Sequence, residues 1–269
     1  QLNEKVSHSE YLNQLDQEKF KIYTRDLKNS LELFRQENIP IFTEVDKLSN
    51  EYGKISGAMT VEHEGETLTL QQAQKLLQSS DRVLRKEIFE KVQNRRAEDK
   101  EKLEDLFDQL LKLRHQIALN AGFDNYRDYM MKSLGRFDYG VKECEDFHEA
   151  IAQVIVPIMK KINQERSDKL QISPLKPYDL DVSVYGDTPL QPFETADELL
   201  HKSISTLNSI EPYFAECLRT MEVMNHLDLD SRIGKRPGGY NMPLPEIGVP
   251  FIFMNAAGTQ RDVVTMLHE

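Results

Sequence analysis

The sequence predicts a mainly α-helical fold with a small antiparallel β-sheet. Apolar residues recur at intervals of three or four through most of the chain, which is the spacing of one buried helix face. Between residues 58 and 68 the pattern changes, and Glu64-Gly65 separates two short segments as in a β-hairpin. The apolar run Phe251–Met254 is short, aromatic and preceded by a segment rich in Gly and Pro, which favours another strand.

Helix-capping residues and prolines divide the helical part of the chain. Asp81 and the pair Thr195 and Glu198 are typical of helix starts, and Pro157 is expected to kink or break a helix. In chain order, the expected helices cover residues 12–34, 41–55, 70–77, 81–96, a segment ending at 121, 125–132, 142–168, 195–208 and 213–224.

Composition narrows the class of protein. The 269 residues carry a net charge of -11 with a pI near 5.2, so attraction to a nucleic-acid backbone is not expected. No apolar run approaches the roughly 20 residues of a membrane span, and the polar start lacks a secretory signal, so no membrane partner is predicted. Cys144 and Cys217 have no paired spacing, which favours a reducing compartment. We therefore expect a cytoplasmic protein.

The chemistry lies in the last segment of the chain. Thr259 is expected to begin a helix that carries His268 and Glu269. In the motif His-Glu-x-x-His, two histidines on one helix face bind a zinc ion and the Glu acts as general base on water. The metal lowers the pKa of that water and polarises the scissile carbonyl. The buried side of this helix is predicted to carry Val263, Val264 and Leu267.

A His-Glu pair alone has little weight, because the chain contains three. His63-Glu64 precedes Gly65 and indicates a turn, and His148-Glu149 indicates a surface pair on a helix. The third pair differs by its context, which is an apolar strand, a Gly turn and a capped amphipathic helix. In zinc peptidases an edge strand beside the metal helix can bind extended peptides. The segment Phe251–Ala257 is predicted to be that strand, with an ordinary core strand as the alternative.

Several segments together resemble the thimet oligopeptidase and oligoendopeptidase F family of zinc metallopeptidases. The resemblance covers residues 56–269. The segments that carry it are Arg136-Phe137-Asp138-Tyr139, Pro177-Tyr178-Asp179-Leu180, Gly234-Lys235-Arg236-Pro237-Gly238-Gly239-Tyr240, and the continuous stretch from Pro250 to Glu269.

The resemblance implies a multi-helix, zincin-like peptidase with a deep channel that admits short unstructured peptides and uses one Zn²⁺ ion. By position, His268 would be the first zinc ligand and Glu269 the general base. The strand residues Met254, Asn255, Ala256 and Ala257 would bind substrate. The sequence ends before the second His of the motif. We therefore expect a truncated chain that is inactive by itself, with a partial N-terminal helical segment (residues 1–55) and a catalytic-domain helical region (residues 56–269).

Three alternatives remain open at this stage. The amphipathic helices could belong to a scaffold or interaction protein without catalytic activity. A carboxylate-bridged metal site inside a helical bundle would need paired Glu-x-x-His motifs, and Glu145 with His148 supplies a single such spacing. The basic residues Arg232, Lys235 and Arg236 could bind a peptide carboxylate or simply form a solvated loop.

Overall fold

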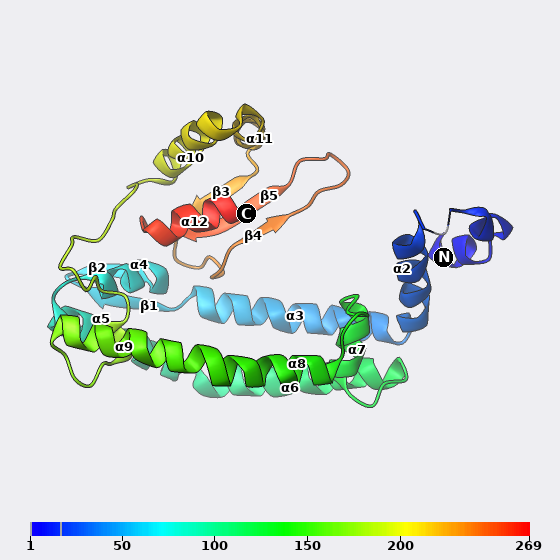
Figure 1. Cartoon of the computed structure of the whole chain (residues 1–269), viewed down its shortest axis with the longest axis horizontal. Coiled ribbons are helices and arrows are strands. Elements are labelled where there is room, and N and C mark those ends of the chain that lie inside the picture. The colour runs from blue at the N-terminus through cyan, green and yellow to red at the C-terminus, as the bar shows by residue number, and fades with distance from the viewer. Residues whose placement is uncertain (1, 17) are drawn as a thin grey trace. The chain divides into compact units, whose positions relative to one another are not determined.

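The computed structural model describes residues 2–16 and 18–269 and confirms the mainly α-helical class (Figure 1). Two compact units are present, Gln1–Asn50 with Lys102–Ile162 and Glu51–Glu101 with Asn163–Glu269. The predicted division near residue 55 stays a prediction. No helix in the described residues is both long and apolar enough to cross a membrane.

The helices and strands have the following bounds. The helices are α1 (Leu2–Ser7), η1 (Glu10–Gln14), α2 (Lys21–Leu33), α3 (Asn38–Gly57), α4 (Leu70–Lys75), η2 (Leu76–Gln78), α5 (Arg82–Glu98), α6 (Lys100–Asn120), α7 (Tyr126–Ser133), α8 (Val141–Ala150), η3 (Ile151–Ile155), α9 (Val156–Leu170), η4 (Pro177–Asp179), α10 (Ala196–Ile210), α11 (Pro212–Val223) and α12 (Gln260–His268). The strands are β1 (Thr60–His63), β2 (Glu66–Thr69), β3 (Leu227–Asp230), β4 (Tyr240–Met242) and β5 (Phe251–Ala256).

The predicted helix over residues 12–34 is wrong in its first half. The Asp16 carboxylate accepts hydrogen bonds from the backbone amides of Glu18 and Lys19 at 3.0 and 3.1 Å, and this local turn competes with a continuous helix. Residues 10–14 form a short 3₁₀ helix, and α2 begins at Lys21. Pro40 lies in the first turn of α3, where its missing N–H is tolerated.

The helix that was expected to be kinked or broken near Pro157 continues past it, with a local change in its hydrogen bonding. A π-helical turn, η3, separates α8 from α9, and Pro157 is the second residue of α9. The Val156 amide donates to the Ile151 carbonyl, five residues earlier. A wider turn of this kind relieves the clash of a proline ring with the preceding helical turn.

In the second unit, the elements predicted from capping and turn residues are confirmed. Strands β1 and β2 pair antiparallel around Glu64 and Gly65, both of which have positive φ as a tight two-residue turn requires. The Asp81 carboxylate accepts from the Val83 amide at the start of α5. The Thr195 hydroxyl accepts from the Glu198 amide at the start of α10.

The second sheet has the order β3-β5-β4 and lies beside α12 (Figure 1). Strand β4 pairs antiparallel with β5 as expected, and β3 adds a parallel strand on the other side. The segment Phe251–Ala256 is therefore the central strand of this sheet. The expectation that it is an edge strand was wrong, because both of its sides are already paired.

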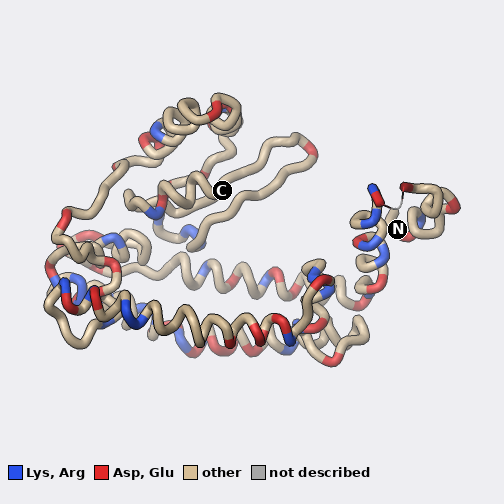
Figure 2. Tube along the Cα trace, in the orientation of Figure 1, with Lys and Arg blue, Asp and Glu red and all other residues tan. Residues whose placement is uncertain are grey.

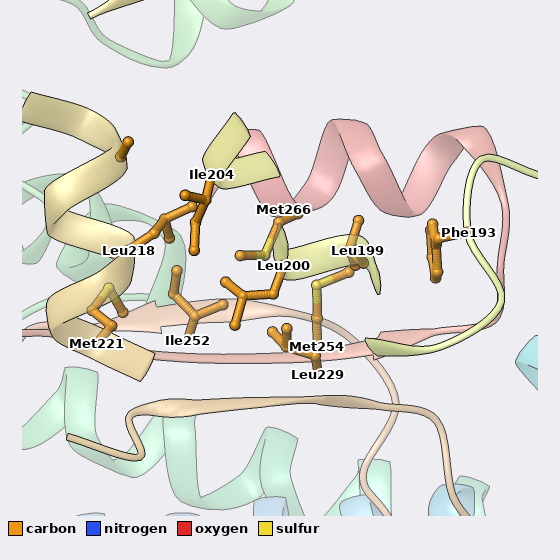
Figure 3. Packing of buried hydrophobic residues seen from close by; sticks show 11 residues of the cluster. Phe193, Leu199, Leu200, Ile204, Leu218, Met221, Leu229, Ile252, Met254 and Met266 are labelled. Carbon is orange, nitrogen blue, oxygen red and sulfur yellow. The ribbon is translucent and has the colours of Figure 1, made fainter. Parts of the chain in front are cut away.

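One apolar cluster joins this sheet to the helices that cover it (Figure 3). Met266 of α12, Ile252 and Met254 of β5 are each almost fully buried. Around them pack side chains of α10, α11 and β3, namely Leu199, Leu200, Ile204, Ala215, Leu218, Met221 and Leu229, with Phe193 from the preceding loop. This packing fixes α12 against β5.

A buried ion pair anchors the loop that precedes α10. Asp179, with no exposed side-chain area, accepts hydrogen bonds from Arg82 at 2.9 and 3.0 Å and from the buried Arg85 at 3.0 Å. The Lys176 backbone amide donates to the same carboxylate at 2.9 Å. Burial alone would raise the pKa of Asp179, but these hydrogen bonds outweigh burial and lower the pKa to about 2.

This pair predicts acid sensitivity. The folded pKa lies below the ordinary value of 3.8, so the ionised carboxylate stabilises the fold above that value. Its contribution is lost as the pH falls from about 4 to about 2. Asp179→Asn leaves Arg85 buried without its ionic partner and should lower the free energy of unfolding by about 3–5 kcal/mol at neutral pH. The variant should also lose part of the acid slope in urea unfolding. The exposed Asp187→Asn serves as control, and equal acid slopes for both variants would contradict the assignment.

Candidate active site

The junction of β5 and α12 is fixed by one carboxylate. Asp262 Oδ2 accepts from the Ala257 amide at 3.0 Å, the Thr259 amide at 2.8 Å and the Thr259 hydroxyl at 2.9 Å. Thr259 in turn caps the Asp262 amide, so the predicted helix start at Thr259 is confirmed. Gly258, which lies between Ala257 and Thr259, has a φ of +93°, and a Cβ there would lie 3.1 Å from the Phe193 carbonyl oxygen. Only glycine fits this turn.

The buried face of α12 differs from the prediction. Met266 is buried and Val263 packs against the same cluster, but Val264 and Leu267 are 59% and 48% exposed. The prediction was therefore wrong for those two residues. The reason is that α12 lies between β5 and α10, and residues three apart on one helix face, Val263 and Met266, fill that contact.

His268 and Glu269 follow on another face of α12. Arg261 and Thr265 both line a cavity, and His268 comes seven and three residues after them, so it continues their face of the helix. His268 is exposed and Glu269 is half-buried. The Asn241 amide of β4 donates to the backbone oxygen of Glu269 at 2.6 Å. The His-Glu pair thus lies beside the sheet, next to β4.

The four predicted substrate residues lie at the end of β5. The Met254 side chain is buried in the core, and its carbonyl accepts from Lys235 Nζ at 2.5 Å. The Asn255 amide group donates to the carbonyls of Arg236 and Gly238 at 2.9 and 2.8 Å. The Ala256 carbonyl accepts from the Ser231 amide at 3.2 Å, and the Ala257 amide donates to Asp262. Much of the hydrogen-bonding capacity of this segment is therefore used within the protein.

A cavity of about 410 Å³ connects this strand to α12. It lies between α4 with η2, the end of β5 and the first turns of α12. Its lining consists of Gln71, Gln74, Lys75, Gln78, Asp181, Gly238, Gly239, Met254, Asn255, Ala257, Thr259, Arg261, Asp262 and Thr265. The structure thus brings three of the predicted substrate residues, Met254, Asn255 and Ala257, to one cavity with α12. Ala256 is absent from its lining.

The basic loop is exposed at Arg232 and Arg236, but Lys235 is not available to a ligand. Lys235 is buried, and its ammonium donates to the carbonyls of Asp228, Asp230 and Met254 and to the Asp228 carboxylate. Burial lowers the pKa of Lys235, and Asp228 opposes that shift. Arg232 forms two hydrogen bonds with Asp228, which together with Lys235 lower the pKa of Asp228 to about 2. Arg236 is exposed. Nothing in the sequence distinguished Lys235 from its basic neighbours.

A complete metal site is not formed by these residues. Across residues 2–16 and 18–269, no group of three or more His, Cys, Asp or Glu side chains is placed to hold an ion. His268 fits the role of a single imidazole ligand at the end of α12. Glu145 and His148 are both exposed on α8, which gives no support to the alternative metal site in a bundle.

Strand β5, a tight glycine turn and the capped helix α12 that ends in His-Glu follow one another as expected for a peptidase. The sequence model of peptidase family M3 matches residues 75–269, and the chain belongs to this family.

Solved structures agree with this assignment. PZ peptidase A, solved with an inhibitor, is 28% identical with a TM-score of 0.92, over 100% of this chain and 48% of that chain. A Bacillus anthracis str. Ames protein assigned as an oligoendopeptidase F is 25% identical, with a TM-score of 0.91, over 100% of this chain and 49% of that chain. The chain thus spans about half the length of the structures it matches. A search of curated proteins finds no match.

The β5–α12 junction gives a prediction. Asp262→Ala removes the acceptor of three hydrogen bonds, and loss of a helix cap typically lowers the free energy of unfolding by about 1–2 kcal/mol. Hydrogen exchange of the Ala257 and Thr259 amides should speed up. Asp197→Ala, in the first turn of α10, is the matched control. Unchanged exchange at both amides in Asp262→Ala would show that this carboxylate does not hold the turn.

Proposed function

We propose that the full-length protein is a zinc-dependent metalloendopeptidase that hydrolyses short unstructured peptides. The observation that carries the proposal is the His-Glu pair at the end of α12, on the helix face that lines the cavity, in a chain of peptidase family M3. The family membership favours this function over a scaffold without catalytic activity.

His268 and Glu269 have separate proposed roles. His268 contributes one imidazole ligand, and Glu269 accepts a proton from the attacking water and passes it to the leaving amine. A bound zinc ion would supply Lewis acidity toward the scissile carbonyl. A stable site needs three or more protein ligands, so the 269-residue chain alone is proposed to be inactive.

The proposed peptide site follows the cavity from β5 toward His268. Met254, Asn255, Ala256 and Ala257 are the proposed substrate-binding residues, with Met254 restricted to backbone contacts by its burial. Because β5 is paired on both sides, the outer strands of this sheet are β3 and β4, each with one unpaired edge among the described residues. Asn241 places β4 next to Glu269. We propose that an extended peptide adds to the unpaired edge of β4.

Cys144 and Cys217 are both free thiols, which supports a reducing, cytoplasmic location. Short peptides are the proposed partners, and neither nucleic acid nor membrane is included in the proposal.

The test uses the full-length protein and a quenched fluorescent peptide. Glu269→Gln replaces the carboxylate with a neutral amide of nearly the same shape and so removes the base. We therefore expect kcat to fall by about 10²–10⁴ with zinc content unchanged. His268→Ala should lose bound zinc as well as activity.

The chain offers a matched control in the exposed His148-Glu149 pair on α8. Glu149→Gln should retain both turnover and zinc. Full activity in Glu269→Gln would refute the role of that residue, and a purified protein without zinc or turnover would favour the scaffold alternative.

A further inference from the structure

We propose that Lys75 and Arg261 form a subsite that binds a carboxylate group of the peptide substrate. Both side chains line the cavity of about 410 Å³ between α4, the end of β5 and α12. This inference rests on the proposed peptidase function and adds a determinant of substrate preference to it.

Lys75 is held over the turn between β5 and α12. It is the last residue of α4 and is half-buried, and its Nζ lies 3.0 Å from the position that a Cβ on Gly258 would occupy. In the described part of the chain, no carboxylate lies within ion-pair distance of this ammonium. The half-buried ammonium therefore lies at the cavity beside the glycine turn without an ionic partner among the described residues.

Arg261 adds a second positive charge to the cavity lining. It is exposed and lies in the first turn of α12, where the helix dipole and the neighbouring Asp262 carry opposite charges. Its guanidinium, too, lacks an ion-pair partner among residues 2–16 and 18–269. The protein as a whole has a net charge of -11, so general basicity does not explain two unpaired cations on one cavity.

Neither acidic residue of the lining forms an ion pair with these cations. The Asp262 carboxylate accepts three hydrogen bonds at the β5–α12 turn. Asp181 is exposed and pairs with neither Lys75 nor Arg261. The cavity is also lined by Gln71 and Gln78, whose side-chain amides can donate hydrogen bonds. The lining is formally neutral, and its two cations are available to a bound carboxylate.

The distance from Arg261 to His268 indicates how far the bound carboxylate lies from the cleaved bond. Seven residues of α-helix separate Arg261 from His268, which is about 10.5 Å along the axis at 1.5 Å per residue. An extended peptide advances about 3.3 Å per residue, so about three residues lie between the cleaved bond and the subsite. A carboxylate suits a guanidinium because the two planar groups form paired hydrogen bonds. It could be the C-terminal carboxylate or an acidic side chain.

The experiment compares kcat/KM for matched peptides on the full-length protein. Two peptides end about three residues after the cleaved bond, one with a terminal carboxylate and one with a terminal amide. The other peptides carry an internal Glu or an internal Gln about three residues before or after that bond. We expect one acid-bearing peptide to be preferred over its neutral partner by about ten-fold, chiefly through KM. The pair that shows the preference identifies which source of carboxylate is bound.

Arg261→Gln and Lys75→Gln should each reduce that preference toward unity, and added salt should do the same. Arg219→Gln changes a half-buried arginine on α11 that pairs with Glu216 outside the cavity lining, and this control should keep the preference. Equal kcat/KM for acidic and neutral peptides in the unaltered protein overturns the inference while leaving the peptidase proposal standing.

Peptide binding by fluorescence anisotropy separates the two hypotheses. If no peptide is cleaved, the peptidase proposal fails, and the subsite is judged by affinity alone. A preference for the acidic peptide of about ten-fold that Arg261→Gln removes supports the subsite, and equal affinities overturn it.

Discussion

The Asp262 carboxylate is the constraint on which the candidate site depends. Its three hydrogen bonds close the turn that carries the chain from β5 into α12. Because α12 starts at a fixed point, every later residue of that helix has a defined direction, and the seven-residue step from Arg261 brings His268 to the cavity side. A capping interaction at the start of a helix thus controls the orientation of chemical groups at its end.

The strand at the other side of the turn is held by buried charge. The Lys235 ammonium lies 4.4 Å from the Phe253 ring centroid and donates to the carbonyls of three residues on β3 and β5. A buried ammonium is tolerated only when its donors are satisfied, and here Asp228 also supplies the opposite charge. The same Asp228 holds Arg232, so one carboxylate ties the loop after β3 back to the strand. Charged residues are spread along the helices of both units (Figure 2), whereas the Lys235 side chain is buried against the sheet.

Local chemistry explains what could be predicted from the sequence. The caps at Asp81, Thr195 and Thr259 and the turn at Glu64-Gly65 each depend on residues close in sequence, and all are present in the structure. The helix predicted over 12–34 failed because the Asp16 side chain offers the backbone an alternative hydrogen-bonding pattern that periodicity does not register.

The features that could not be predicted depend on contacts between distant segments. Whether β5 lies at an edge is decided by β3, more than twenty residues earlier in the chain, and no pattern within β5 records it. The buried face of α12 is decided by α10, which selects Val263 and Met266 over Val264 and Leu267. Likewise, Lys75 and Arg261 are ordinary helix residues in sequence, and only the fold places them on one cavity.

The three His-Glu pairs show that the surrounding structure, rather than the dipeptide itself, determines whether such a pair can take part in catalysis. His63-Glu64 leads into a hairpin turn, and His148-Glu149 lies exposed on α8, where Glu149 bonds only to Gln153 four residues on. His268-Glu269 differs because its helix is capped, packed on a buried strand and bordered by a cavity with unpaired cations. An imidazole and a carboxylate can perform hydrolysis only when a substrate is held beside them in one orientation. Among the three pairs, His268-Glu269 ends a helix that lines a cavity and contacts an outer strand of the second sheet, and we propose that the orientation of the substrate comes from these two features.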